Sequence, residues 1–194
     1  MKKHSVNLLL LNVQSNFLHI YDFPIIQGIK QDAYQIELVI DKTSTEDAKN
    51  REALEKAIKD IKFLYNLQDF KNFKNVFFKD GDEHIQNNST KKDLEKYYKN
   101  CTIIKGKSKF EIDLFNTDKT ILKKDSNVKI NSGDYVDVLG TITVTEFMSS
   151  KYLSFYPSAI RFRSKGNRGG LSIQEKLDYF DDIEESPFSN DKIV

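Results

Sequence analysis

Residues Asp134–Arg163 read DYVDVLGTITVTEFMSSKYLSFYPSAIRFR, and their first half alternates between apolar and polar side chains with the period of a β-strand. One face of this strand is aliphatic and carries Val136, Val138, Ile142 and Val144. The other face is polar and carries Asp137, Thr141, Thr143 and Thr145. We expect the first set to face a core and the second to face solvent, which makes this segment a long strand.

Gly140 interrupts that strand at its centre. An internal glycine commonly marks a bulge or a sharp coil, which allows one strand of a small barrel to pair with two neighbours. After a turn at residues 148–150, the same alternation places Ile160 and Phe162 in the core and Arg161 and Arg163 on the outer surface. The segment therefore predicts a β-hairpin.

Further strand signals lie on both sides of this hairpin. Residues 33–40 (AYQIELVI) alternate, with Tyr34, Ile36, Leu38 and Ile40 on one face. Shorter strand-like segments occupy residues 6–13, 17–23, 102–104, 110–115, 152–156 and 159–163. Several short strands separated by turn residues favour a small barrel or a sandwich.

The period of the apolar residues changes after residue 42. Helical spacing relates Leu54, Ala57, Ile58, Ile61 and Tyr65, so we expect one amphipathic helix over residues 45–65. Thr43 and Glu46 have the spacing of a capping box at its start. Its other face carries the cations Arg51, Lys56, Lys59 and Lys62. We expect these cations to be solvated, and we expect irregular structure over residues 70–100 with a short helix at 91–98.

Charge is divided unevenly along the chain. Residues 171–194 hold two lysines and seven acidic residues, a net charge of −5, which leaves +6 on residues 1–170 of a chain whose net charge is +1. Gly166, Gly169 and Gly170 precede the acidic segment. We expect one domain over residues 1–165, then a glycine-containing linker and a disordered acidic tail over 166–194. This polarity indicates a polyanionic partner and a tail that competes for the same surface.

Two basic runs without acidic residues, 99–109 and 151–170, have aromatic residues among or beside them. Phosphates require cations and unpaired bases require flat apolar faces, so the combination suits single strands better than duplex grooves. The predicted nucleic-acid contacts are Lys105, Lys107, Lys109, Lys151, Tyr152, Tyr156, Arg161, Arg163, Lys165 and Arg168. We expect GKSK (Gly106–Lys109) and Arg161 to border one groove, with Tyr152 as the leading stacking residue. The alternative makes the lysines solvated and the aromatics core.

No pattern of residues specifies catalysis or a resident cofactor, and we predict neither. The segment KDGDE (Lys79–Glu83) could offer the carboxylates of Asp80, Asp82 and Glu83 to a metal ion. Asp-Gly is also a common turn former, and we favour a turn. A metal-dependent nuclease using these three carboxylates remains the alternative.

The cellular environment is suggested by two further features. Cys101 is the single cysteine and cannot form an internal disulfide, which indicates a reducing compartment. No apolar run has the length of a membrane span. We therefore predict a cytoplasmic protein without membrane contact.

Five segments also occur together in a known group of proteins. They are AYQIELVIDK (Ala33–Lys42), KDGDE, GKSK, SGDYVDVLGTITV (Ser132–Val144) and YLSFYPSAIRFRSKG (Tyr152–Gly166). With the acidic tail, this series resembles the phage single-stranded DNA-binding proteins of the DUF2815 type, which are similar to the T7-type single-stranded DNA-binding protein. The resemblance covers nearly the whole chain.

The resemblance implies a mainly β protein with an OB-like β-barrel, one amphipathic helix and a disordered acidic tail. It also implies sequence-independent binding of single-stranded DNA in phage replication or recombination, without enzymatic activity. The tail would contact replication or recombination proteins through Asp178, Phe180, Asp181, Asp182, Glu184, Glu185 and Phe188. A homodimer, and a purely structural or interaction barrel that binds no nucleic acid, are left open by the sequence.

Overall fold

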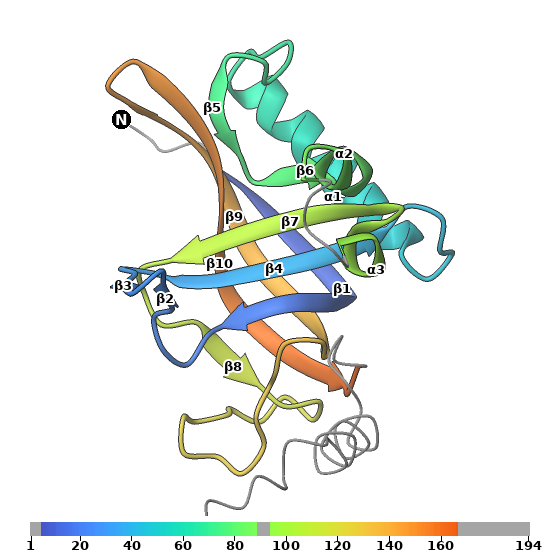
Figure 1. Ribbon diagram of the computed structural model, residues 1–194, viewed down its shortest axis with the longest axis vertical. Coiled ribbons are helices and arrows are strands. Elements are labelled where there is room, and N and C mark those ends of the chain that lie inside the picture. Colours follow the sequence, from blue (N-terminus) through green and yellow to red (C-terminus); the bar gives the residue numbers. More distant parts are fainter. Residues whose placement is uncertain (1–4, 89–93, 167–194) are drawn as a thin grey trace, which may run out of the picture.

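A computed structural model describes residues 5–88 and 94–166 of the chain. Its elements in chain order are β1 Ser5–His19, β2 Ile25–Ile26, β3 Ile29–Lys30, β4 Tyr34–Asp41, α1 Ala48–Leu64, β5 Phe73–Val76, β6 Phe78–Asp80, α2 Gly81–Gln86, α3 Leu94–Tyr98, β7 Cys101–Ser108, β8 Asp113–Phe115, β9 Tyr135–Phe147 and β10 Ser150–Ser164. The protein is mainly β, as predicted (Figure 1).

Five strands close a barrel in the order β1–β4–β7–β10–β9, with β9 pairing again with β1. Neighbours run antiparallel except β7 and β10, which run parallel and meet at Gly106 and Phe155. Short strands extend this ring, since β5 and β8 pair with β10 and β6 pairs with β7. A closed five-stranded barrel of this kind is the OB arrangement, which confirms the expected fold.

The barrel core is centred on Phe155, which is 1% exposed. Two glycines of neighbouring strands make room for its ring. A Cβ atom on Gly140 would lie 2.5 Å from Phe155 Cε2, and one on Gly106 would lie 3.0 Å from Phe155 Cδ1. The predicted bulge is present, but it lies in β10 opposite Gly140, where the register shifts between Pro157 and Ala159. Gly140 is therefore required by the close approach of the Phe155 ring.

The N-terminal strand is longer than the sequence indicates. The segments 6–13 and 17–23, expected as two strands, contribute to one bent strand that ends at His19. Its first half pairs with β9 and its second half with β4. The register shifts between Leu10 and Val13, where Asn12 adopts φ 49°. The strand keeps its backbone hydrogen bonds to β9 before the bend and to β4 after it. Polar residues at the bend therefore do not end the strand.

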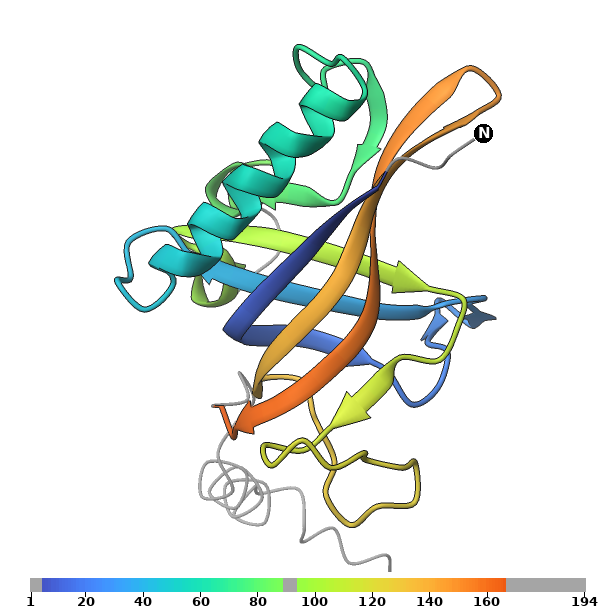
Figure 2. The same cartoon turned by 180° about the vertical axis from the view of Figure 1, so that it is seen from behind.

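Helix α1 lies across β1 (Figure 2) and buries Leu54, Ala57 and Ile61, as its apolar spacing predicts. Asn50 fixes it to the barrel, because its side chain accepts from Leu11 N–H at 2.8 Å and donates to Leu11 O at 2.9 Å. This buried amide satisfies the backbone of β1 beside its bend.

The start of α1 corrects the expected capping box. The helix begins at Ala48, after Asp47, and no side chain caps it. Thr43 and Ser44 instead form a turn around the carboxylate of Asp41, which accepts from Thr43 N, Thr43 Oγ1 and Ser44 N at 2.6–2.9 Å. Arg51 is not simply solvated, since its guanidinium donates to Asp41 O and Ser44 O. Asp41 competes successfully for the donors that a capping box would use.

Residues 70–100 are more regular than expected. The predicted short helix is α3, but β5, β6 and α2 also form here. KDGDE starts α2 and is not an isolated turn: Asp80 Oδ1 accepts from Asp82 N and Glu83 N at 2.9 and 3.2 Å. The pairing partners of these short strands lie far away in the sequence, in β7 and β10. A local period therefore could not reveal them.

Candidate nucleic-acid interface

The outer surface of β1, β4 and β7 carries a regular array of side chains in two cross-strand rows. We call this surface the strand face, and define it by Phe17, His19, Gln35, Glu37, Lys105 and Lys107. In one row His19 pairs with Gln35 and Gln35 with Lys107; in the other Phe17 pairs with Glu37 and Glu37 with Lys105. Residues that pair across strands project from the same side of a sheet, so all six share one face.

Alternation along β7 explains why its lysines lie on this face. Gly106 points inward against Phe155, and Lys105 and Lys107 on either side of it are exposed. Lys105 pairs with Glu37, whereas no described residue forms an ion pair with Lys107. Lys109 follows the strand and lies 3.0 Å from Asp32 Oδ2. The three predicted lysines of the first basic run are therefore together at the end of β7.

The strand face continues across the junction between β7 and β10. Phe155 and Gly106 are partners in this parallel pair and both point inward. Their successors, Tyr156 and Lys107, therefore lie next to each other on the outer surface. Tyr156 is 40% exposed. One aromatic and one unpaired lysine predicted from separate segments of the sequence are brought together here.

A second exposed aromatic stands on the opposite side of the strand face. Phe17 is 41% exposed and packs edge-on against His19, with ring centroids 4.3 Å apart. Phe17, His19, Gln35 and Glu37 were not predicted as site residues. Their sequence neighbourhood has no basic run, and only the cross-strand register places them beside Lys105 and Lys107.

Glu37 is the one acidic residue among the six that define the strand face. Its carboxylate accepts from Tyr98 Oη at 2.6 Å, Asn16 Nδ2 at 2.9 Å and Lys105 Nζ at 2.9 Å. Burial raises the pKa of Glu37, but these hydrogen bonds and the charge of Lys105 outweigh burial and lower its pKa overall. Burial and the Glu37 carboxylate raise the pKa of the Tyr98 phenol. Glu37 is therefore held in its ionised form.

Exposed apolar side chains lie on two hairpins of the barrel. Figure 1 shows the β2–β3 hairpin near the end of β7 and the β9–β10 hairpin beside β5. The β2–β3 hairpin exposes Ile25 and Ile29. The turn between β9 and β10 exposes Phe147 and Met148. Lys151 and Tyr152 lie close to the turn of this second hairpin, where Tyr152 is half-buried between Thr145 of β9 and Asn75 of β5.

The remaining described basic residues of the second run, in β10 and directly after it, lie elsewhere on the barrel. Arg161 points outward, as predicted, and its guanidinium pairs with Asp137 of β9, which also accepts from Asn12 N–H at 2.7 Å. Arg163 lies 3.6 Å from Asp137, and Lys165 lies 3.0 Å from Asp134 Oδ2. Both carboxylates are almost fully buried. These cations therefore already compensate buried charges.

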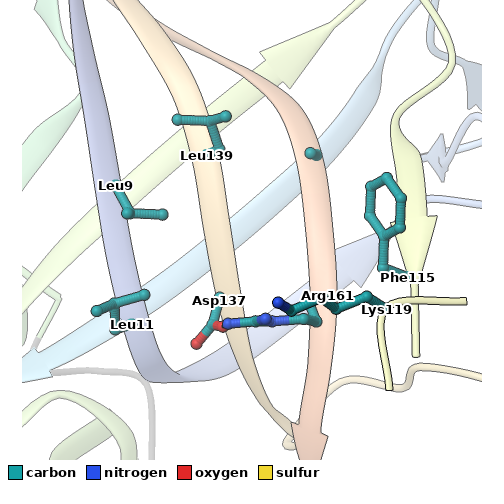
Figure 3. Close-up of a pocket in the computed structure, with 8 residues that line it drawn as sticks. Leu9, Leu11, Phe115, Lys119, Asp137, Leu139 and Arg161 are labelled. Carbon is teal, nitrogen blue, oxygen red and sulfur yellow. The ribbon is translucent and has the colours of Figure 1, made fainter. Parts of the chain in front are cut away.

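Arg161 borders an apolar groove, shown in Figure 3, of about 310 Å³. Leu9 and Leu11 of β1, Leu139 of β9 and Phe115 of β8 line it. β8 pairs with β10 at Arg161, whereas β7 meets β10 only at Phe155. The structure therefore places Arg161 and the GKSK lysines on different parts of the barrel. Arg168 and the predicted tail contacts Asp178, Phe180, Asp181, Asp182, Glu184, Glu185 and Phe188 lie outside the described residues.

Two of the three carboxylates considered for a metal site, those of Asp80 and Asp82, pair with a lysine. Lys42 Nζ lies 2.6 Å from Asp80 Oδ2 and 2.8 Å from Asp82 Oδ2. Over residues 5–88 and 94–166, no three His, Cys, Asp or Glu side chains are grouped in a way that could hold a metal ion. None of the helices in these ranges has the length and apolar character of a membrane span.

Comparisons with known proteins agree on one group. Residues 6–185 match the family described as Enterobacter phage Enc34, ssDNA-binding protein. The chain is similar to the single-stranded DNA-binding protein from bacteriophage Enc34 in complex with ssDNA, at 15% identity and a TM-score of 0.62, over 84% of this chain and 89% of that one. The C-terminal truncation of that Enc34 protein gives 16% identity and a TM-score of 0.63, over 87% and 94% of the two chains.

A third similar structure is gp2.5, a single-stranded DNA-binding protein encoded by bacteriophage T7. It shares 10% identity with this chain at a TM-score of 0.52, over 99% of each chain. No curated protein matches the sequence. At these identities the solved structures establish a shared fold.

Proposed function

The chain belongs to the family of the Enterobacter phage Enc34 ssDNA-binding protein, and we propose from this membership that it binds single-stranded DNA through the strand face without reading its sequence. The observation that carries the proposal is the position of Lys107 beside Tyr156, with Phe17 and Lys105 on the same surface. Cations for phosphates and exposed rings for bases are the two requirements of sequence-tolerant binding. Binding of this kind would serve phage DNA replication or recombination in the host-cell cytoplasm.

The position of the strand face within the fold supports the same proposal. OB-folds bind oligonucleotides on the face of their second and third strands, between the loops that join strands 1–2 and 4–5. In this barrel those strands are β4 and β7, and the loops are residues 20–33 and the turn between β9 and β10. The lysines of β7 and the exposed apolar residues of both hairpins therefore lie where this fold commonly holds a strand.

The decisive experiment is a titration of labelled oligo-dT, oligo-rA and duplex DNA at several salt concentrations. We expect single strands to bind more tightly than duplex, with little dependence on base composition and a steep loss of affinity with salt. Equal affinity for duplex and single strand at moderate salt would contradict the proposed face. Absence of any salt-dependent binding would instead favour the purely structural barrel.

Lys107 supplies the first mutational test. Lys107→Ala removes a cation that no described residue pairs with, so we expect weaker binding of oligo-dT and a salt slope reduced by about 0.7. Thermal unfolding should stay close to that of the parent, because the side chain is exposed. An unchanged slope in the folded variant would remove Lys107 from the interface.

The other predicted cations divide into two groups in this proposal. Lys109 follows β7, whereas Lys151 and Tyr152 lie in the β9–β10 hairpin beside β5, and we propose that they extend the path of the strand beyond the strand face. Arg161, Arg163 and Lys165 can contact phosphate only while they also neutralise Asp137 and Asp134. Arg161→Ala should therefore lower stability more than Lys107→Ala does, since it leaves the carboxylate of Asp137 with one fewer charged partner. Arg168 stays a predicted phosphate contact.

We further propose two functional parts, a binding domain over residues 1–165 and a linker with an acidic tail over 166–194. The tail carries a net charge of −5 over residues 171–194, and a tethered polyanion competes with DNA at high effective concentration. Deleting residues 171–194 should raise the affinity for single strands at low salt and change it little at high salt. Fluorescence titration of both proteins checks this, and equal affinities at low salt would exclude competition.

The acidic and aromatic residues of the tail are also the proposed contacts for replication or recombination proteins. We propose no enzymatic activity: Asp80 and Asp82 pair with Lys42, and Asp80 also holds the start of α2. Incubation of labelled single strands with the protein and Mg²⁺ or Mn²⁺ tests this directly. Degradation that Asp80→Asn abolishes would restore the nuclease alternative.

A separate measurement, sedimentation analysis, would show whether the protein is a homodimer.

A further inference from the structure

A buried carboxylate occupies the middle of a surface that we propose binds phosphates. The Glu37 side chain is 11% exposed and lies on β4 between Phe17 of β1 and Lys105 of β7. A negative charge in this place opposes an incoming polyanion. The core of the barrel does not explain it, because Glu37 projects from the outer face.

The two oxygens of Glu37 have different partners. Oε1 accepts from two neutral donors, Tyr98 Oη at 2.6 Å and Asn16 Nδ2 at 2.9 Å. Oε2 lies 2.9 Å from Lys105 Nζ, whose side chain is 48% exposed. One oxygen therefore fixes the carboxylate to its neighbours, and the other neutralises a cation that solvent can reach.

The carboxylate cannot easily move aside when DNA arrives. Asn16 comes from the irregular part of β1, where the register shifts between Ser15 and Phe17, and Tyr98 is the last residue of α3. Three separate elements thus hold Glu37, and hydrogen bonds from them stabilise its ionised form. Lys105 approaches DNA with a fixed counter-charge beside it.

We propose that Glu37 limits the affinity of the strand face for single-stranded DNA by neutralising Lys105, an inference that rests on the proposed function. Lys107 and Lys105 project from the same strand on the same side, but among the described residues only Lys105 has a carboxylate within ion-pair distance. The pair Glu37–Lys105 therefore contributes no net charge to binding.

The test is Glu37→Gln, which distinguishes the roles of the two carboxylate oxygens. The glutamine carbonyl can take the place of Oε1 and accept from Tyr98 and Asn16, whereas the amide group facing Lys105 carries no charge and donates only. Lys105 loses its counter-charge, while the hydrogen bonds from Tyr98 and Asn16 remain. We expect affinity for oligo-dT at low salt to rise roughly three- to tenfold, with a salt slope steeper by about 0.7, as for one added phosphate contact.

Two further variants complete the cycle. Lys105→Gln leaves Glu37 without its cation and should bind more weakly than the parent. The double variant Glu37→Gln with Lys105→Gln removes both charges, and its two amides can hydrogen-bond to each other, so it should bind more tightly than Lys105→Gln and more weakly than Glu37→Gln. Tyr98→Phe removes one neutral hydrogen bond and should leave the salt slope unchanged.

The outcomes distinguish this inference from the proposed function. If Glu37→Gln folds but binds no better, while Lys107→Ala loses affinity, the strand face binds DNA and the role of Glu37 is wrong. If the salt slope of the double variant is smaller than that of the parent by the amount expected for one phosphate contact, Lys105 is a full contact in the parent. The inference is then equally wrong. If Lys107→Ala and all the Glu37 variants bind like the parent, the proposed face itself fails.

Discussion

Phe155→Ala lowers the free energy of unfolding by about 3–5 kcal/mol, the usual cost of truncating a core aromatic residue. The ring is the largest side chain among the fully buried ones in the described residues. It lies between Gly106 and Gly140 and contacts Phe77, with ring centroids 5.9 Å apart. Neither glycine has a side chain that could fill the space, so the cavity would persist. Urea unfolding at equilibrium measures the loss.

The matched control for this prediction is Phe110→Ala. Phe110 is 82% exposed, so its truncation should change stability by less than about 0.5 kcal/mol. Both variants replace phenylalanine by alanine, so a difference in their stability reports the effect of burial and not that of residue type. A loss below about 1 kcal/mol for Phe155→Ala would mean that the barrel collapses around the cavity, in contrast to the rigid arrangement that the two glycines indicate.

Tyr156→Ala should reduce binding of single-stranded DNA by about 1–3 kcal/mol, the cost of removing an aromatic residue on which a base stacks. This residue directly follows Phe155 but projects outward beside Lys107. The effect should therefore be on binding, while the unfolding midpoint changes little. Titration with labelled oligo-dT at one fixed salt concentration measures it.

Tyr156→Phe is the control, since it keeps the ring and removes only the hydroxyl group. Stacking predicts that the phenylalanine variant binds like the parent and that the salt slope is the same in both variants, because no phosphate contact is lost. Tyr152→Ala, close to the turn of the β9–β10 hairpin, tests the stacking residue favoured by the sequence. If Tyr156→Ala binds normally and Tyr152→Ala does not, the strand passes along the hairpin and leaves the junction with β7 uncovered.

Strand alternation predicted the core residues of β9 and β10 well, with two exceptions. Asp137, expected to face solvent, is 5% exposed because Arg161 covers it, and Phe162, expected in the core, is only partly buried. Val136, Val138 and Ile142 are fully buried, as is Ile160, and Arg161 faces outward. The apolar period of α1 was equally informative, whereas its first turn was not. The reason is that Asp41, Thr43 and Ser44 form a local turn that uses the donors and acceptors expected for the cap. Competing hydrogen bonds of similar strength are not distinguished by spacing alone.

The basic runs drew attention to β7 and β10, but they did not reveal which cations share a surface. Lys107 and Tyr156 are neighbours because β7 and β10 run parallel at Gly106 and Phe155. Arg161 lies apart because Asp137 and β8 are its neighbours. Both facts depend on contacts between segments distant in the chain.

From the amino-acid order alone follow the mainly β character, the core side of each long strand, the amphipathic helix and the separation of a basic body from an acidic C-terminal segment. These properties depend on periods of two and 3.6 residues and on composition, which are local quantities. The strand face, with Glu37 among Phe17 and Lys105, follows from tertiary structure instead. The alternating pattern of a strand shows to which side of the sheet each side chain points. Strand order and register decide which residues are its neighbours on that side, and closure of the barrel sets both.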